Sequence, residues 1–282
     1  MLAQAILGPG AHGKHLQLLR SAGLAIASSG HGIPGGSRDL VIILGGDGTI
    51  HRFLPDLIRS RLPVLVLPCG SGNDLAHALR IESMQVGVEL AREFARGNAR
   101  ISQIDLGIVA DSSGRETPFC CTGGVGLDAV AAQFANRLPR WIHAHGGYLL
   151  GATRALFANP CLRLKITANT GFATESQCSI FSFANTPSFG GGLPIAPSAE
   201  LNDGHLDCVW VDATSRSRLA KATISLLKGK HLQLQEVHSM RADGLRIDSD
   251  PPTQVYADGE FVCETPIDVR VLRGALAALR PA

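Results

Sequence analysis

Two glycine-rich turns, each placed directly after an apolar run, contain the residues best suited to binding a phosphate group. GGDGT (45–49) follows LVIIL (40–44), and CGSGND (69–74) follows PVLVLP (63–68). Glycine adopts the backbone angles of a tight turn and lets main-chain N–H groups approach an anion closely. A helical pattern follows each turn, and Asn73 or Asp74 is expected to cap the second helix. We therefore predict two phosphate-binding loops.

The two turns are expected to lie at the same edge of a sheet. If a right-handed βαβ unit joins the two strands, both turns emerge at strand carboxyl ends, where open α/β sheets bind ligands. The alternative is that each is an ordinary strand-to-helix turn, since glycine is common there for steric reasons. Asp47 argues against this alternative, because an acid beside a phosphate is unfavourable unless it meets a metal ion or a substrate proton. A kinase supplies both.

The elements that must position these turns follow an alternating pattern over about the first hundred residues. Short apolar runs alternate with longer helical patterns, which is typical of βαβ units around a parallel sheet. Strands are predicted near 2–7, 24–28, 40–44 and 63–67, and helices over 14–22, 50–60, 73–81 and 84–96.

From about Arg100 the pattern changes to many short β-type runs, which predicts a second, β-rich domain. The runs are 161–169, 179–185, 205–212 and 245–249, and helical patterns interrupt them at 127–137, 141–158 and 215–228. The predicted fold class is α/β plus β: a parallel-sheet nucleotide-binding domain, then a β-sandwich-type domain. The predicted boundaries are 1–105 for the first domain and 106–270 for the second, with 271–282 returning to the first.

Composition narrows the class of protein. The 282 residues are 45% hydrophobic and 18% charged, which suits a globular chain with a large core. A formal charge of +2 is too small to indicate a nucleic-acid partner. The seven cysteines form no C-x-x-C pair and are interpreted as reduced, mostly buried thiols. Because the longest apolar runs are strand-sized, we expect a cytoplasmic protein, peripheral at the inner face of a membrane at most.

The order of motifs along the chain resembles the catalytic domain of diacylglycerol and sphingosine kinases and their bacterial lipid-kinase relatives. GGDGT (45–49) and LPCGSGNDLAHAL (67–79) carry the first part of the resemblance. CTGGVGLDAVAA (121–132), GGGLPIAPSAELNDGHLD (190–207) and YADGE (256–260) continue it in the family's order. GGDGT also occurs in NAD kinases and phosphofructokinases, so the downstream motifs favour a lipid kinase.

The resemblance implies ATP and Mg²⁺ as cofactors, a diacylglycerol-like membrane lipid as substrate and a phosphatidic-acid-like product. It places Glu260 or Asp258 as the general base and Asp47 as a ligand of Mg²⁺ or as the base. It also implies a structural Mg²⁺ site at Asp203, with main-chain oxygens near Glu200 and His205, although Asp-Gly also favours a hairpin turn on its own. The residues that it places around the ATP phosphates are Gly45, Gly46, Asp47, Gly48, Thr49, Gly70, Ser71, Gly72, Asn73 and Asp74.

The chain departs from the family pattern at two places. Arg52 stands where the family usually has glutamate, and the usual Asn-Pro-x-x-Gly opening is missing, with GPGAHGK (8–14) as its expected remnant. Two alternatives to the lipid kinase therefore stay open: an NAD kinase-like small-molecule kinase, and a catalytically silent lipid- or nucleotide-binding protein. Relatives are often dimers, and the sequence leaves the oligomeric state open.

Two segments are candidates for the membrane side of the protein. Residues 216–231 carry five cations and no acid, which suits anionic headgroups, although a solvated helix face is the more common reason for such a cluster. Residues 136–157 combine arginines, Trp141 and Tyr148 with an apolar face, a mixture that suits a membrane interface or core packing.

Overall fold

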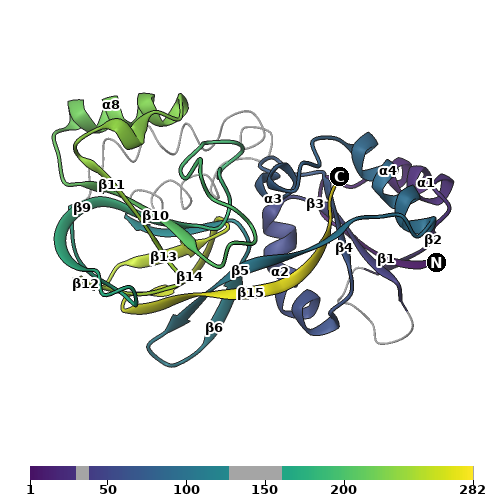
Figure 1. The fold of residues 1–282 in the computed structure, drawn as a ribbon, viewed down its shortest axis with the longest axis horizontal. Helices are drawn as coiled ribbons and strands as arrows, with labels where there is room; N and C mark the ends of the chain where they lie inside the picture. Colours follow the sequence, from purple (N-terminus) through teal and green to yellow (C-terminus); the bar gives the residue numbers. More distant parts are fainter. Residues whose placement is uncertain (30–37, 127–160, 282) are drawn as a thin grey trace. The chain divides into compact units, whose positions relative to one another are not determined.

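The computed structural model describes residues 1–29, 38–126 and 161–281. The chain divides into two compact units, the first formed by Met1–Asp105 with Arg273–Ala282 and the second by Leu106–Leu272. Strands β5 (Ile101–Asp111) and β15 (Ile267–Leu279) each contribute residues to both units (Figure 1).

The first unit is built on a parallel sheet. Its strand order is β2 (Ala25–Ser29), β1 (Leu2–Leu7), β3 (Leu40–Gly45) and β4 (Val64–Pro68). The end of β15 continues the sheet beside β4, where Ala278 lies opposite Val64 in parallel register. Every residue of β3 is buried, as expected for a parallel strand that is covered on both faces.

Four helices accompany this sheet: α1 (Gly13–Ser21), α2 (Asp47–Ser60), α3 (Asp74–Ala78) and α4 (Met84–Ala95). Figure 1 shows α1 and α4 together on one face and α2 on the other. This arrangement follows from right-handed connections, because β2 and β4 lie on opposite sides of the β1–β3 pair. Helix α2 buries Ile50, Leu54 and Leu57, a stripe at helical spacing that faces the sheet.

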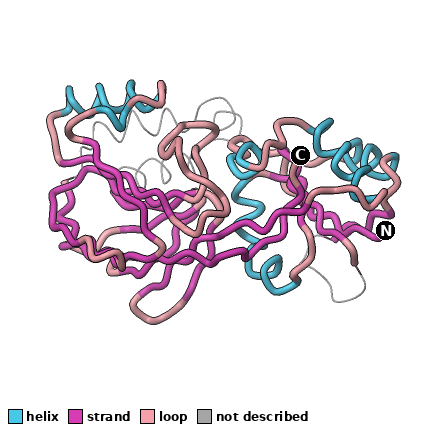
Figure 2. The backbone as a smooth tube through the Cα atoms, viewed as in Figure 1, coloured by secondary structure: helices cyan, strands magenta, loops and turns pink. Residues whose placement is uncertain are grey.

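The second unit is dominated by strands, as the tube in Figure 2 shows, and the pairs described below are antiparallel. One run of neighbours is β12 (Gly244–Asp250), β8 (Leu162–Ala168), β9 (Ala173–Ala184), β7 (Thr122–Gly126), β13 (Gln254–Ala257) and β14 (Glu260–Glu264). The carboxyl half of β9 also pairs with β10 (Leu206–Asp212), which pairs with β11 (Val237–Ala242). Strand β5 pairs with β6 (Glu116–Phe119).

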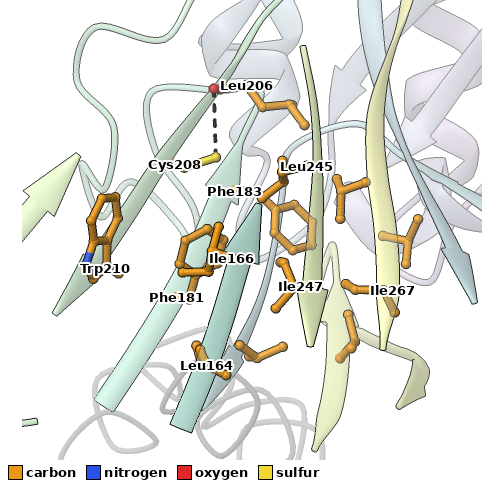
Figure 3. Close-up of a cluster of buried hydrophobic side chains, with 14 of the residues drawn as sticks. Leu164, Ile166, Phe181, Phe183, Leu206, Cys208, Trp210, Leu245, Ile247 and Ile267 are labelled. Atoms are coloured by element: carbon orange, nitrogen blue, oxygen red, sulfur yellow. Dashed lines mark hydrogen bonds between the residues drawn. The ribbon is translucent and has the colours of Figure 1, made fainter. Parts of the chain in front are cut away.

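An apolar core fills the space between these strands (Figure 3). In β8, Leu164 and Ile166 are buried and alternate with exposed residues, the period expected for a strand with one buried face. Phe183 packs edge-on against Phe119, with their ring centroids 5.3 Å apart. This core fixes the strands that carry the candidate carboxylates described below.

A separate apolar cluster joins helix α8 (Arg216–Leu227) to the sheet. Leu219 and Ala222 of α8 pack with Val209 and Val211 of β10 and with Val237 of β11. Ser215 caps the helix by accepting a hydrogen bond from the Arg218 N–H. A 3₁₀ turn, η1 (His231–Gln233), follows the helix.

The fold class predicted from the sequence is confirmed: a parallel α/β unit precedes a β-rich unit. Helix α3 ends at Ala78, earlier than the predicted 73–81, and the second helix begins at Asp47 rather than at 50. The helical patterns predicted at 127–137 and 141–158, including the candidate membrane segment 136–157, lie outside the described residues. All seven cysteines are free thiols, four of them buried. Among the described helices, none is long and apolar enough to cross a membrane.

Candidate functional site

The two glycine-rich loops of the first unit touch each other through their backbones. A Cβ atom added to Gly70 would lie 2.4 Å from the Gly46 Cα and 2.8 Å from the Gly46 nitrogen. A Cβ atom added to Gly45 would lie 2.6 Å from the Thr49 Cβ. Real Cβ atoms do not approach other atoms this closely, so glycine is required at Gly45 and Gly70 by the close packing of the loops.

Asp47 joins the first loop to the second. Its Oδ2 accepts a hydrogen bond from the Asp74 N–H at 3.0 Å, and its Oδ1 accepts one from the Leu75 N–H at 3.1 Å. The carboxylate therefore caps the start of α3 from a position 27 residues earlier in the chain. The sequence had assigned this capping role to Asn73 or Asp74, and that expectation is wrong.

Asn73 instead closes the second loop on itself. It adopts a left-handed conformation with φ of 61° and makes no side-chain cap. Its Oδ1 accepts a hydrogen bond from the Gly70 N–H, and its Nδ2 donates one to the Gly70 carbonyl, both at 2.8 Å. Gly70 and Ser71 are exposed in the second loop and Gly48 is exposed in the first turn of α2, where a ligand can reach them.

The loop after β1 lies against both of these loops. The Gly8 N–H donates a hydrogen bond to the Leu44 carbonyl at 2.8 Å, and a Cβ atom added to Gly10 would lie 1.9 Å from the Cys69 oxygen. Gly8 and Gly10 lie at the start of the GPGAHGK segment (8–14), so the first residues of that segment belong to the same loop cluster. Burial raises the pKa of the Cys69 thiol, which keeps that side chain uncharged.

The loop cluster lies where the sheet order changes direction. Strands β1 and β3 are neighbours, and the chain proceeds from them to opposite sides. This is the topological switch point at which open α/β sheets bind ligands. Helix α2 also starts here, at Asp47. Its N-cap residue is Gly46, which has no side chain to cap the helix, so the N–H groups of the first turn of α2 suit an anion. Arg52 lies exposed on α2.

Asp258 occupies a two-residue hairpin turn between β13 and β14 in the second unit. Asp258 and Gly259 have φ values of 50° and 85°, the left-handed pair that Asp-Gly hairpins favour. The Asp258 Oδ2 accepts a hydrogen bond from the Cys120 N–H at 2.9 Å, and its Oδ1 accepts one from the Cys121 N–H at 2.8 Å. The carboxylate of Asp258 is therefore held in one orientation, while Glu260 is exposed at the start of β14.

Cys120 and Cys121, to which the sequence assigns no role in a site, complete this second cluster. They link β6 to β7, and Asn185 fixes the link by donating from its Nδ2 to the Cys120 carbonyl at 3.0 Å. The Asn185 N–H also donates to the Cys121 carbonyl at 2.8 Å. Cys121 begins the segment CTGGVGLDAVAA, but nothing local in the sequence indicates a partner 137 residues away.

The predicted metal residues near Asp203 lie around an arginine. The Asp203 carboxylate pairs with the Arg241 guanidinium, whose Nε lies 3.6 Å from the Asp207 Oδ2. The Asp203 Oδ1 also accepts a hydrogen bond from the His205 N–H at 2.9 Å, while the Glu200 side chain is exposed. Burial raises the pKa of the Asp207 carboxyl. In this arrangement the Arg241 guanidinium neutralises Asp203, and the Mg²⁺ site at Asp203, Glu200 and His205 stays a prediction.

Two family models match the chain. The diacylglycerol kinase catalytic domain matches residues 20–109, and the YegS C-terminal NAD kinase beta sandwich-like domain matches residues 122–280. A diacylglycerol kinase of Mycobacterium tuberculosis (strain H37Rv) is 31% identical over 245 residues, 86% of this chain and 77% of the relative. A diacylglycerol kinase of Bacillus subtilis (strain 168) is 26% identical, over 79% of this chain and 71% of the relative.

Solved structures show the same fold. A diacylglycerol kinase from Bacillus anthracis str. Sterne superimposes with a TM-score of 0.70 at 19% identity, over 99% of this chain and 96% of that one. An NAD kinase from Archaeoglobus fulgidus in complex with ATP gives a TM-score of 0.54 at 14% identity, over 99% and 93% of the two chains. At these identities the similarity establishes the fold alone.

Proposed function

The chain belongs to the diacylglycerol kinase family, and we propose that it transfers the γ-phosphoryl group of ATP to a hydroxyl group of a diacylglycerol-like lipid. The observation that carries the proposal is the pair of touching glycine loops at the switch point of a parallel sheet, in a chain that matches this family over both units. The product is a phosphatidic-acid-like lipid.

We assign ATP binding to the first unit, which corresponds to the predicted domain 1–105 with the returning segment near 271–282. The phosphates lie against the loops Gly45–Thr49 and Gly70–Asp74, whose N–H groups and helix terminus favour negative charge. Asn73 and Asp47 support the proposal, because they hold the second loop in a fixed shape before any ligand arrives. Phosphoryl transfer depends mainly on such positioning and on neutralising charge.

Mg²⁺ bound with ATP would neutralise the charge of the phosphates. Asp47 is the carboxylate of the loop cluster that would hold it. Its two hydrogen bonds, from the Asp74 and Leu75 N–H groups, hold the carboxylate in place within the loop cluster. The hard oxygen donors of this residue suit Mg²⁺.

The second unit, predicted as 106–270, binds the lipid in this proposal. Asp258 accepts the proton of the lipid hydroxyl, because its carboxylate is the one that main-chain N–H groups hold in place. A general base must lie within hydrogen-bond reach of the proton it takes, so a fixed orientation favours Asp258 over the exposed Glu260. Glu260 then approaches the same substrate from the neighbouring position on the hairpin.

Helix α8 makes the peripheral membrane contact in this proposal. Its Leu219 and Ala222 are buried against the sheet, and Ile224 on the opposite side is 56% exposed. Lys221 lies three residues before Ile224 on the same face of α8, and Lys228 is the C-cap residue that follows the helix. An exposed apolar side chain between two cations suits the interface of an anionic membrane.

The test of the proposal is transfer of label from radiolabelled ATP to lipid in mixed micelles with Mg²⁺. The panel contains diacylglycerol, monoacylglycerol, ceramide, sphingosine and NAD. We expect the label in diacylglycerol. NAD is included because the chain shares its fold with an ATP-bound NAD kinase, and label in NAD would reject the lipid kinase.

A further inference from the structure

We propose that Cys120, Cys121 and Asp258 form a binding site for Zn²⁺ or a similar thiophilic divalent cation, and that occupation of this site inhibits the enzyme. The three residues form the one group of metal-capable side chains found within the described parts of the chain. The binding proposal stands on geometry alone. The inhibition rests on the proposed function, in which Asp258 is the base.

Two of the three distances between the ligand atoms match the edges of one tetrahedral zinc site. The two sulfur atoms lie 3.7 Å apart, and the Cys120 Sγ lies 3.5 Å from the Asp258 Oδ2. With Zn–S near 2.3 Å and Zn–O near 2.0 Å, the corresponding edges of a Zn²⁺ tetrahedron are about 3.8 Å and about 3.5 Å. All three ligand atoms lie within 4.8 Å of one another. A zinc ion therefore requires little movement of these side chains.

The local backbone explains why two adjacent cysteines point the same way. Successive side chains of a regular strand point to opposite faces. Cys120 and Cys121 lie in the link between β6, which ends at Phe119, and β7, which begins at Thr122. Asn185 and Asp258 bind the backbone of this link. The sulfur atoms are thereby brought together before any metal binds.

The chemistry of the ligands selects the ion. Each thiol releases its proton on binding, so one Zn²⁺ displaces two protons and joins two thiolates and one carboxylate, for a net charge of −1. Thiolates favour Zn²⁺, whereas Mg²⁺ prefers oxygen ligands, so millimolar Mg²⁺ in a kinase assay does not compete well. Water takes the fourth position, as in open zinc sites.

The cation reaches the site from the side of the hairpin. Both cysteines are buried, but Asp258 is half-buried and is followed by the exposed residues Gly259 and Glu260. Once bound, the ion ties up the Asp258 carboxylate, which can no longer accept a proton from the lipid hydroxyl. Inhibition should therefore be reversed by a chelator.

The test uses the full chain under a thiol-free reductant and Co²⁺ as a spectroscopic substitute for Zn²⁺. We expect one equivalent of Co²⁺ to give a sulfur-to-cobalt charge-transfer band, and Zn²⁺ to abolish that band. The band should be lost in the double variant Cys120→Ser/Cys121→Ser and retained in Cys161→Ser, a matched control at an exposed thiol. Absence of the band in the unmodified protein, or its persistence in the double variant, would overturn the proposal.

Two further measurements test the metal site and its effect on the enzyme separately. Zn²⁺ should protect Cys120 and Cys121 of the unmodified protein from alkylation, as mapped by mass spectrometry, which requires no variant to fold. Equal alkylation with and without Zn²⁺ contradicts the site. Zn²⁺ should inhibit transfer in the unmodified enzyme and not in the double variant. If the protein binds Co²⁺ but phosphorylates no lipid, the metal site stands and the proposed function fails.

Discussion

The Asp47 carboxylate accepts a hydrogen bond from the main-chain N–H of Asp74 at 3.0 Å, and this contact connects the two loops that we assign to the ATP phosphates. Main-chain N–H groups therefore partner this carboxylate, whereas the sequence predicts a metal ion or a substrate proton as its partner. Asp47 therefore stabilises the start of α3 in addition to any role in catalysis. Measurements of stability and of ATP binding separate these two roles.

Replacing Asp47 with alanine removes both acceptors at the start of α3. We expect a loss of stability of about 1 kcal/mol, typical of a lost helix cap, together with weaker ATP binding. Urea unfolding and calorimetry with ATP measure the two effects. Asp56→Ala is the matched control, because Asp56 lies on the same helix and pairs only at the surface with Arg59. Equal stability of Asp47→Ala and Asp56→Ala would refute the capping role.

Gly70→Ala places a Cβ atom 2.4 Å from the Gly46 Cα, so the loops must separate. We expect ATP affinity to fall at least about tenfold, or about 1.4 kcal/mol. Gly13→Ala is the control, because a Cβ atom added there meets nothing within 4 Å. If Gly70→Ala binds ATP as well as Gly13→Ala does, the two loops do not form the nucleotide site.

The sequence predicts the first unit well because its elements have strong local signals. The fully apolar β3 and the spacing of Ile50, Leu54 and Leu57 identify a buried strand and a one-sided helix. The glycine loops are equally visible. The sequence predicts strand β9 as 179–185, but the strand begins at Ala173. Its amino-terminal half is rich in polar residues and becomes a strand by pairing with β8.

The sequence predicts only part of the candidate site, because the contacts that it does not indicate join residues far apart in the chain. Nothing local in the sequence indicates that Asp47 caps α3, that Cys120 and Cys121 bind Asp258, or that Arg241 pairs with Asp203. Each contact depends on sheet register and spans tens of residues. The register of β10 against β11, for example, sets Asp207 opposite Arg241.

Buried His231 predicts a dependence of stability on pH. Its Nε2 donates a hydrogen bond to the Ile195 carbonyl at 2.8 Å, and burial lowers the pKa of the imidazole below its ordinary value of 6.5. The folded state therefore binds fewer protons than the unfolded state. The stabilising contribution is fully present above about pH 6.5 and is lost as the pH falls below that value.

We expect the free energy of unfolding to fall less between about pH 7.5 and about pH 5 in His231→Gln than in the unmodified protein. Glutamine retains a donor for the Ile195 carbonyl but does not titrate. His77→Gln, a change at an exposed histidine, should leave the pH dependence unaltered. Parallel pH profiles for the unmodified protein and His231→Gln would show that His231 does not contribute.

If α8 contacts the membrane, removing its positive charges should weaken the binding of the protein to anionic vesicles. Lys221→Gln/Lys228→Gln should cost about 2 kcal/mol, roughly thirtyfold in binding to phosphatidylglycerol-containing vesicles. Arg92→Gln/Arg96→Gln on α4 removes the same charge elsewhere and serves as the control in vesicle sedimentation. Equal losses in the two double variants would show that α8 has no special role.

The most direct test of the central claim is transfer of label from radiolabelled ATP to diacylglycerol in mixed micelles, measured for the unmodified protein, Asp258→Asn and Asp268→Asn. Asp268 is an exposed carboxylate of the same unit, so its variant should retain activity. We predict label in diacylglycerol, reduced on the order of 10²-fold to 10⁴-fold in Asp258→Asn. Label in no lipid despite measurable ATP binding, or label in NAD instead, would contradict the assignment as a lipid kinase.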